Sequence, residues 1–193
     1  MRATLIARTI QVIADEGLSK TTTKAIVLGT GINEAYIYRL FNDKSDLLTN
    51  AFDVLDNELL EQSLTHFSVM SLPDLDIEAR CRLYFQAMWD FLLGNREKCI
   101  AYIRYFYSPY FTKHSATTHQ ERFAPVVEKF RNAFLEEADV WMILNHILNV
   151  MLDFAIKVHN GQMPDEDNYS EHVFRVIYVS VKQYFKTSKE SEV

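Results

Sequence analysis

The sequence contains few of the residues that interrupt regular structure. Only 5 glycines and 4 prolines occur among its 193 residues, and they stand between long segments with periodic apolar side chains. A chain with so few breaks is expected to form long helices joined by short connections.

Cysteine is equally scarce. Cys81 and Cys99 have no metal-ligand spacing and no partners for a disulfide framework, and His114 and His119 lie five positions apart in a loop-like stretch. We therefore predict no metal site, two core thiols, and a reduced, cytoplasmic setting.

Membrane and targeting signals are also missing. The N-terminal segment MRATLIARTIQVIADEG has no basic region followed by an unbroken apolar run, which argues against a signal peptide. No stretch approaches the roughly 20 apolar residues that span a bilayer. The sequence predicts no membrane partner.

Enzyme signatures are absent as well. The chain has no nucleophile elbow with a Ser/His/Asp set, no glycine-rich phosphate loop and no paired metal-ligand motif. We expect no catalytic residues and no cofactor.

Positive charge is in deficit overall, since the net charge is −6. Residues 1–48 nevertheless carry six Lys and Arg against five Asp and Glu, whereas the remainder carries 14 against 21. Because phosphate binding depends on the charge of the docking face, this balance is neutral evidence on a nucleic-acid partner.

Apolar periodicity indicates a compact group of helices at the N-terminus. A first helix over 4–16 ends at Gly17, a second runs through 25–28 after threonine caps, and a third from Glu34 to Phe41 follows Asn33. Ile26, Ile32, Ile37 and Phe41 are expected to pack this pair against the first and fourth helices. Two short helices with a tight turn between them are the form that presents a helix to the major groove.

A long fourth helix is expected from Asp43 to about His66, with Leu48, Phe52, Leu55 and Leu59 inward and Asp53, Asp56, Glu58 and Glu61 outward. Five further helices are predicted at 75–93, 96–107, 117–137, 139–159 and 166–186. The fold class is all-α, with about nine helices: an N-terminal three-helix helix-turn-helix domain at 1–46 and a helical ligand-sensing and dimerisation domain at 47–193.

The segment from Gly17 to Leu48 resembles the TetR family of regulators. The family pattern is matched in register by twelve residues: Gly17, Thr21, Thr22, Ile26, Gly31, Ile32, Ile37, Tyr38, Phe41, Lys44, Asp46 and Leu47. The rest of the chain is similar to the family only in length and helical character.

The resemblance implies two kinds of DNA contact. Thr22, Tyr38 and Lys44 would bind phosphates, and the bases would be read by Asn33, Glu34, Tyr36 and Arg39. Tyr36 departs from the family, which has Thr or Ser there. Glu34 either accepts from a cytosine amino group or is a helix-start acid favoured by the macrodipole. Alternatively, Tyr38 packs and Lys44 is merely solvated.

Large aromatic side chains are dense in the middle of the chain. The family encloses a ligand between its middle helices, so we predict a pocket for a small lipophilic or aromatic effector. Its predicted lining is Tyr84, Phe85, Met88, Trp89, Tyr102, Tyr105, Phe106, Tyr110, Phe123 and Phe130, with Arg104, His146 and Asn149 as polar anchors. The alternative is that this aromatic stripe is plain core.

The segment 139–159 is apolar around most of its circumference, so it needs cover on nearly all sides. A four-helix bundle with a second chain would supply it, and burial within one chain is the alternative. The predicted dimer interface is Leu144, Leu148, Met151, Val173, Ile177 and Val181.

Together these features predict a ligand-responsive repressor that binds a palindromic double-stranded DNA operator as a homodimer. Two alternatives stay open, a helix-turn-helix regulator without a small-molecule ligand and a helical protein-interaction module.

Overall fold

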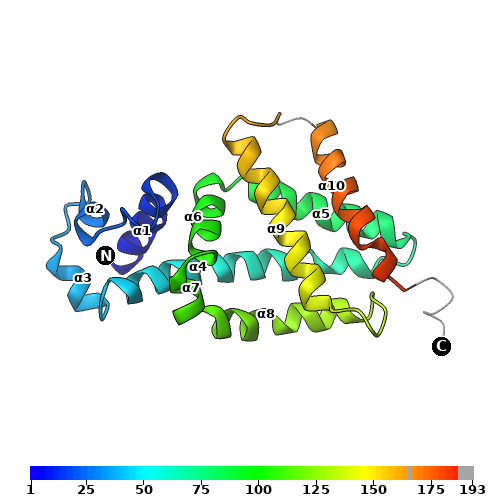
Figure 1. Ribbon diagram of the computed structural model, residues 1–193, viewed down its shortest axis with the longest axis horizontal. Coiled ribbons are helices and arrows are strands. Elements are labelled where there is room, and N and C mark those ends of the chain that lie inside the picture. The colour runs from blue at the N-terminus through cyan, green and yellow to red at the C-terminus, as the bar shows by residue number, and fades with distance from the viewer. Residues whose placement is uncertain (165–166, 187–193) are drawn as a thin grey trace. The chain divides into compact units, whose positions relative to one another are not determined.

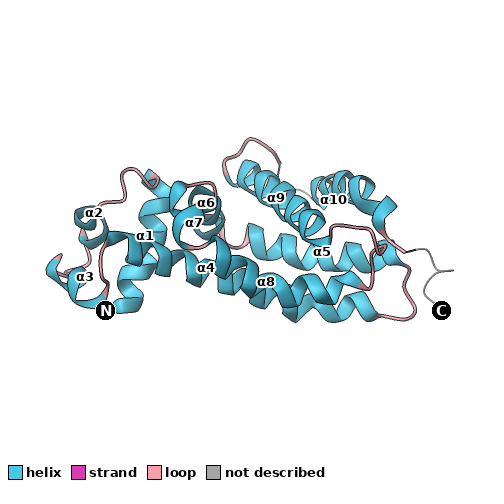
Figure 2. Cartoon of the chain, turned by 60° about the horizontal axis from the view of Figure 1, so that its bottom comes forward, coloured by secondary structure: helices cyan, strands magenta, loops and turns pink. Residues whose placement is uncertain are grey.

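The computed structural model describes residues 1–164 and 167–186, and within these ranges the chain is helical without a strand (Figure 2). An isolated antiparallel bridge joins Phe134 to Phe185. The predicted all-α class, with an N-terminal helix-turn-helix followed by a helical region, is confirmed.

The described residues contain ten α-helices and two short 3₁₀ helices; Figure 1 labels the α-helices. They are α1 (Arg2–Glu16), α2 (Thr23–Val27), α3 (Ala35–Leu40), α4 (Lys44–His66), η1 (Phe67–Ser71), α5 (Ile77–Leu93), α6 (Arg96–Phe106), α7 (Pro109–His114), α8 (Ala116–Arg131), α9 (Val140–His159), α10 (Asp167–Val181) and η2 (Lys182–Tyr184).

These helices are divided between two compact units. Unit 1 comprises Met1–Leu59 and Asn95–Glu121, and unit 2 comprises Leu60–Gly94 and the described part of the chain from Arg122 onward. Helices α6 and α7 therefore fold together with the N-terminal helices. The functional boundary after residue 46 remains a prediction.

The helix-turn-helix in unit 1 is built on a small apolar core. Leu5 of α1, Ile26 of α2, Ile37 of α3 and Leu47 of α4 are all completely buried, together with Phe41. Helices of five and six residues are too short to be stable alone, so this shared core is what stabilises α2 and α3.

Local sequence fixes the ends of these short helices. The Thr22 hydroxyl accepts from the Ala25 N–H at 3.1 Å and caps α2. Gly29 and Gly31 have φ angles of 77° and 70°, which side-chain-bearing residues rarely adopt, so the turn into α3 needs glycine at both positions.

The inward face of α4 in unit 1 follows the predicted stripe, since Leu48, Phe52, Leu55 and Leu59 are buried. The expected outward position of Asp56 is wrong, because its side chain is fully buried. Its carboxylate lies 2.8 Å from Nδ1 of His119 on α8. This polar partner offsets the free-energy cost of burying the carboxylate.

The region after Pro109 also differs from the prediction. A separate helix, α7, begins at Pro109 after Ser108, whose hydroxyl accepts from the Phe111 N–H. Proline is favoured in the first turn of a helix, so it starts α7 here as well as ending α6. The helix expected at 117–137 is α8, which ends at Arg131 and carries Pro125 inside it.

In unit 2, α5, α9 and α10 pack against one another (Figure 1). The helix predicted at 166–186 is α10, whose α-helical part ends at Val181 and is followed by η2. Residue 166 lies outside the described residues.

The expectation that no segment is long and apolar enough to span a bilayer is wrong for α9. Helix α9 has 20 residues with a mean hydropathy of 1.3, enough to cross a bilayer by length and composition. A single helix of this kind is weak evidence, because core helices of soluble proteins share these properties. About 28% of its apolar window is buried within the chain.

Candidate functional site

The outer face of α3 is exposed to solvent. Ile37 points into the core, while Tyr38 is 59% exposed and Tyr36 and Arg39 also reach solvent. With one apolar anchor inward and three large polar side chains outward, α3 can lie along another surface without losing its own packing.

The four predicted base-reading residues fall into two pairs. The Asn33 side-chain oxygen accepts from the Ala35 N–H at 2.9 Å, and the Glu34 carboxylate accepts from the hydroxyl of Thr23. Both side chains therefore stabilise the start of α3. By contrast, the Arg39 guanidinium lies 5.1 Å from the centre of the Tyr36 ring, a stacked pair on the open face.

The three predicted phosphate-binding residues lie at three successive helices, α2, α3 and α4. Thr22 caps α2 and is exposed, and Lys44 is the first residue of α4. Among the described residues, the Tyr38 hydroxyl and the Lys44 ammonium have no hydrogen-bond or ion-pair partner. These two polar groups are free to donate to an added anion.

The comparisons with known proteins agree with this geometry. Residues 5–51 match the sequence profile of the bacterial regulatory proteins, tetR family. The helix-turn-helix of this chain is therefore that of the TetR family. The predicted family is thereby confirmed, and the protein is a DNA-binding transcription regulator. No curated protein matches the sequence.

Solved structures share the fold over nearly the whole chain. A TetR family regulator from Marinobacter aquaeolei VT8 has a TM-score of 0.75 at 17% identity, covering 93% of this chain and 94% of the other. A putative tetR family regulator from Shewanella sp. PV-4 has 0.75 at 14%, covering 93% and 96%. The multidrug binding protein EbrR complexed with imidazole has 0.60 at 14%, covering 91% and 93%. At these identities the likeness shows the fold alone.

The ten residues predicted to line a ligand pocket are divided between the units. Tyr102, Tyr105, Phe106 and Tyr110 lie in unit 1, and the other six lie in unit 2. In unit 1 the Phe52 ring of α4 stacks on Tyr105 at 4.6 Å and packs on Tyr102 at 5.2 Å. Phe52, Tyr102 and Tyr105 are therefore closely packed and buried, and the pocket lining predicted in this unit stays a prediction.

Unit 2 contains a partly enclosed apolar cavity of about 70 Å³. Three of the predicted residues, Tyr84, Phe85 and Phe130, line it. The rest of the lining is apolar or weakly polar: Met70, Cys81, Phe134, Leu144, Ile147, Met151, Phe174, Ile177, Tyr178, Val181 and Phe185. Met88, Trp89 and Phe123 are buried elsewhere in unit 2.

Among the residues that the structure describes, no charged side chain lines this cavity. Burial raises the pKa of Tyr84 to about 12, against a smaller opposing effect of the hydrogen bond from its hydroxyl to the Ser63 carbonyl. Burial likewise raises the pKa of the Cys81 thiol to about 12. Both groups are therefore neutral near pH 7.

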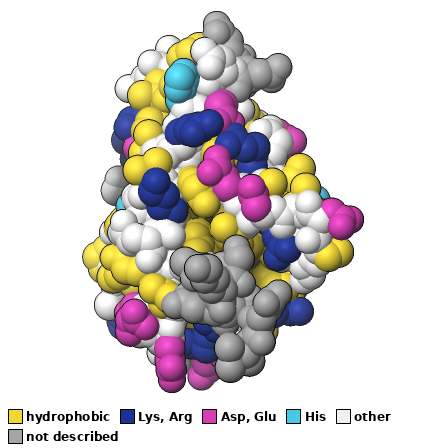
Figure 3. Space-filling model, turned by 90° about the vertical axis from the view of Figure 1, so that its right-hand side faces the viewer, with side chains coloured by type: hydrophobic (Ala, Val, Ile, Leu, Met, Phe, Trp, Pro, Cys, Tyr) yellow, Lys and Arg dark blue, Asp and Glu magenta, His cyan; other side chains and the backbone are white. Residues whose placement is uncertain are grey.

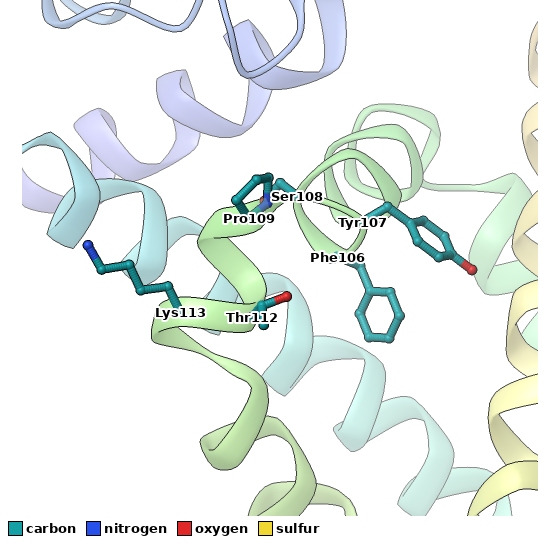
Figure 4. Close-up of a pocket in the computed structure, with 6 residues that line it drawn as sticks. All are labelled: Phe106, Tyr107, Ser108, Pro109, Thr112 and Lys113. Atoms are coloured by element: carbon teal, nitrogen blue, oxygen red, sulfur yellow. The ribbon is translucent and has the colours of Figure 1, made fainter.

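A second hollow of about 560 Å³ lies on the surface of unit 1 at the α6–α7 corner. Figure 4 shows the Lys113 side chain directed away from Phe106 and Tyr107, so the charge and the aromatic rings do not converge. This arrangement is not that of a formed binding site.

The proposed polar anchors lie outside the unit 2 cavity. Arg104 donates to the carbonyls of Ile13 and Ala14 at 2.8 and 3.0 Å, which places its charge at the C-terminal end of α1. His146 Nε2 lies 3.1 Å from the Ser180 hydroxyl on the exposed side of α9 and α10. Asn149 is half-buried on α9.

The predicted dimer residues point largely inward. Met151, Val173, Ile177 and Val181 are each at most 4% exposed within a single chain, while Leu144 and Leu148 are half-buried. The chain's own side chains already cover the first four. The exposed apolar residues of these helices are instead Met142, Val176 and Val179, at 54%, 56% and 56%.

Figure 3 shows a face of the molecule on which acidic and basic side chains alternate instead of gathering by sign. A surface of this kind has no concentrated positive potential to attract a phosphate backbone. The polar face of α3 in unit 1 remains the candidate DNA surface.

Sequence reasoning missed the polar contacts that secure α3. Arg2 Nη1 donates to the Leu40 carbonyl at 2.7 Å, a contact between positions 38 residues apart. No local pattern could indicate it, because such a pairing depends on how α1, α3 and α4 pack.

Proposed function

We propose that this protein is a repressor that binds a palindromic operator as a homodimer and releases it on binding a small lipophilic or aromatic effector. The observation that carries the proposal is the exposed, core-anchored face of α3 with the stacked Tyr36–Arg39 pair. Helices presented in this way enter the major groove of duplex DNA.

Base reading is assigned to Tyr36 and Arg39. Arginine recognises guanine through a bidentate contact, and the ring beneath Arg39 would restrict the orientations of its guanidinium. Tyr36 is 36% exposed and can meet a thymine methyl group or a phosphate. Asn33 and Glu34 would contribute to DNA binding indirectly. Their side chains already have hydrogen-bond partners at the start of α3, and these contacts stabilise that helix end.

Phosphate binding is assigned to Thr22, Tyr38 and Lys44. The unpaired Tyr38 hydroxyl and Lys44 ammonium supply donors, and contacts of this kind fix register without selecting sequence. The weak positive balance of residues 1–48 implies that few phosphates are neutralised per subunit.

The dimer is assigned to the exposed side of α9 and α10. Met142, Val176 and Val179 place apolar side chains there, and His146 with Ser180 adds polar groups on the same side. Two subunits related by a two-fold axis would read half-sites about 34–36 Å apart, or multiples of that distance.

The effector is assigned to the cavity of unit 2. Because burying an unpaired charge is costly, a cavity without charged lining favours an uncharged molecule. The cavity holds about 70 Å³, so a molecule larger than a few atoms has to widen it. The effector would weaken DNA binding by its differential affinity for the widened state.

The same small volume favours a second candidate, a regulator without a ligand, since ligand pockets usually enclose roughly 300–1,000 Å³. Calorimetry of operator binding with and without lipophilic cations, dyes and fatty acyl compounds separates the two. Trp89 and Trp141 fluorescence would report binding. Identical operator affinity with every bound compound contradicts the inducible mechanism.

DNA binding itself is tested with a duplex selected by the protein from a randomised pool. We expect a two-fold symmetric site and an affinity that falls steeply with salt. A protein that is monomeric and does not bind duplex DNA at low ionic strength would contradict the whole proposal. The protein-interaction module would then be the remaining function.

A further inference from the structure

The C-terminal end of α3 is held by a polar network that no assigned DNA contact explains. Arg2 at the start of α1 spans three elements of unit 1. It donates to the Leu40 carbonyl at 2.7 Å and to the Asn50 side-chain oxygen on α4 at 2.6 Å, and its guanidinium lies 4.4 Å from the centre of the Phe41 ring.

The network continues along α4 and back to the turn after α3. The Asn50 amide donates to Oδ1 of Asp46 at 2.7 Å, and Oδ2 of Asp46 accepts from the Asn42 N–H at 2.8 Å. Arg2, Asn50 and Asp46 thus form a closed circuit around the α3–α4 turn.

The chemistry of this circuit favours arginine at position 2. The planar guanidinium directs two N–H groups to two acceptors on different helices, and its face covers an apolar ring. Its positive charge lies beside the last carbonyl of α3, where the helix dipole favours a cation. A lysine could keep the charge but could not keep both directed bonds and the stacked face.

The opposite end of α3 has its own attachment through Glu34 and Thr23. A helix of six residues with one completely buried side chain has little apolar packing to fix its direction. Polar contacts at its two ends therefore determine the orientation of its outer face.

We infer that Arg2 is a positioning residue for DNA recognition, which acts through Asn50 and Asp46 to orient α3 and makes no phosphate contact of its own. This inference rests on the proposed DNA binding by α3. Arg2 is exposed and cationic, so the competing assignment is an ordinary phosphate contact.

The two assignments differ in four variants, Arg2→Lys, Arg2→Ala, Asn50→Ala and the Arg2→Ala/Asn50→Ala double variant. Anisotropy titrations would use the duplex selected by the unaltered protein, an unrelated duplex of equal length, and several salt concentrations. Asn57→Ala is the matched control, because Asn57 is an exposed asparagine on the same helix.

We expect each single variant, Arg2→Lys included, to weaken binding to the selected duplex about ten-fold. The double variant should be no weaker than either single alanine variant, because both break one circuit. The salt slope should stay unchanged, and the selected duplex should lose more affinity than the unrelated one.

A phosphate contact gives the opposite pattern. Arg2→Lys would then bind almost normally, Asn50→Ala would have no effect, and Arg2→Ala would reduce the salt slope by about 0.9 per lost contact. Any of these results, or additive effects of the two alanine changes, would overturn the inference.

Hydrogen exchange of the α3 amides provides a readout without DNA. Exchange should quicken in Arg2→Ala and Asn50→Ala but not in Asn57→Ala, and unchanged exchange would refute the positioning role. If the unaltered protein selects no duplex, the proposed DNA binding fails, and the exchange result still shows separately whether the circuit orders α3.

Discussion

Among single residues, Asp56 and His119 illustrate how a charged side chain is accommodated inside unit 1. Asp56 is fully buried and His119 is 4% exposed, with 2.8 Å between Oδ1 and Nδ1. The Tyr102 hydroxyl donates to the same carboxylate oxygen at 3.4 Å. Phe106 and Phe111 pack edge-on against the imidazole, so water is kept from the pair.

Loss of either partner of this pair should destabilise the fold strongly. We expect Asp56→Ala and His119→Ala each to lower the free energy of unfolding by about 3 kcal/mol, since each leaves a buried polar group without its closest partner. Urea unfolding at fixed protein concentration measures this. Asn57→Ala, one position along α4 and exposed, should change stability little. A loss below about 1 kcal/mol for both variants would contradict the interpretation.

Arg39 provides the residue-scale test of base reading. Arg39→Ala should weaken binding to a selected operator about ten-fold or more and relax the preference at one base pair per half-site. Repeating the selection with the variant reveals the second effect. Arg96→Ala removes the same charge from an exposed position on α6 and should change neither. Equal weakening on all sequences would show that Arg39 binds phosphate instead.

At the scale of elements, helical periodicity predicted most of the architecture correctly. Spacing alone predicts that Ile26, Ile37 and Phe41 are core residues, and all three are buried there. Periodicity could not show that the polar Asp56 lies within the buried face of α4, because its partner comes from α8. The same limit applies to Arg2, whose acceptors lie on α3 and α4.

The candidate site was predictable in part for the same reason. Positions on α3 are local to one motif, so the sequence placed Tyr36, Tyr38 and Arg39 on the outer face. The sequence also reveals the apolar stripes of α9 and α10. Amphipathicity does not show, however, whether such a stripe packs within its own chain or against a second one. Met151 and Ile177, assigned to a partner chain, line the cavity of their own unit.

The junction of α1 and α6 gives an element-scale prediction. Arg104 donates to two carbonyls at the end of α1, a helix with no basic residue in its own last turn. We expect Arg104→Ala to lower the free energy of unfolding by about 1–2 kcal/mol through lost hydrogen bonds and lost charge at the helix C-terminus. Arg96→Ala on the same helix is the control, and thermal or urea unfolding is the measurement. Equal effects of the two changes would contradict the capping role.

For the whole molecule, the exposed side of α9 and α10 decides between a monomer and a dimer. Val176 and Val179 are adjacent on one side of α10, and Met142 is exposed on α9. Most other residues of α9 are buried or half-buried within the single chain, so the apolar surface left for a second copy centres on these exposed side chains. A two-fold contact would also pair two α3 helices for one operator.

The Val176→Glu/Val179→Glu double variant tests this assembly. Four carboxylates facing one another across a two-fold interface should convert the dimer to a monomer, which analytical ultracentrifugation measures directly. Because a lone helix-turn-helix makes few contacts, operator affinity should fall by at least about a hundred-fold, while helical content by circular dichroism is retained. Val54→Glu on α4, at an apolar residue 36% exposed in unit 1, is the matched control and should leave the dimer intact. A double variant that sediments as a dimer and binds its operator normally would place the subunit contact elsewhere.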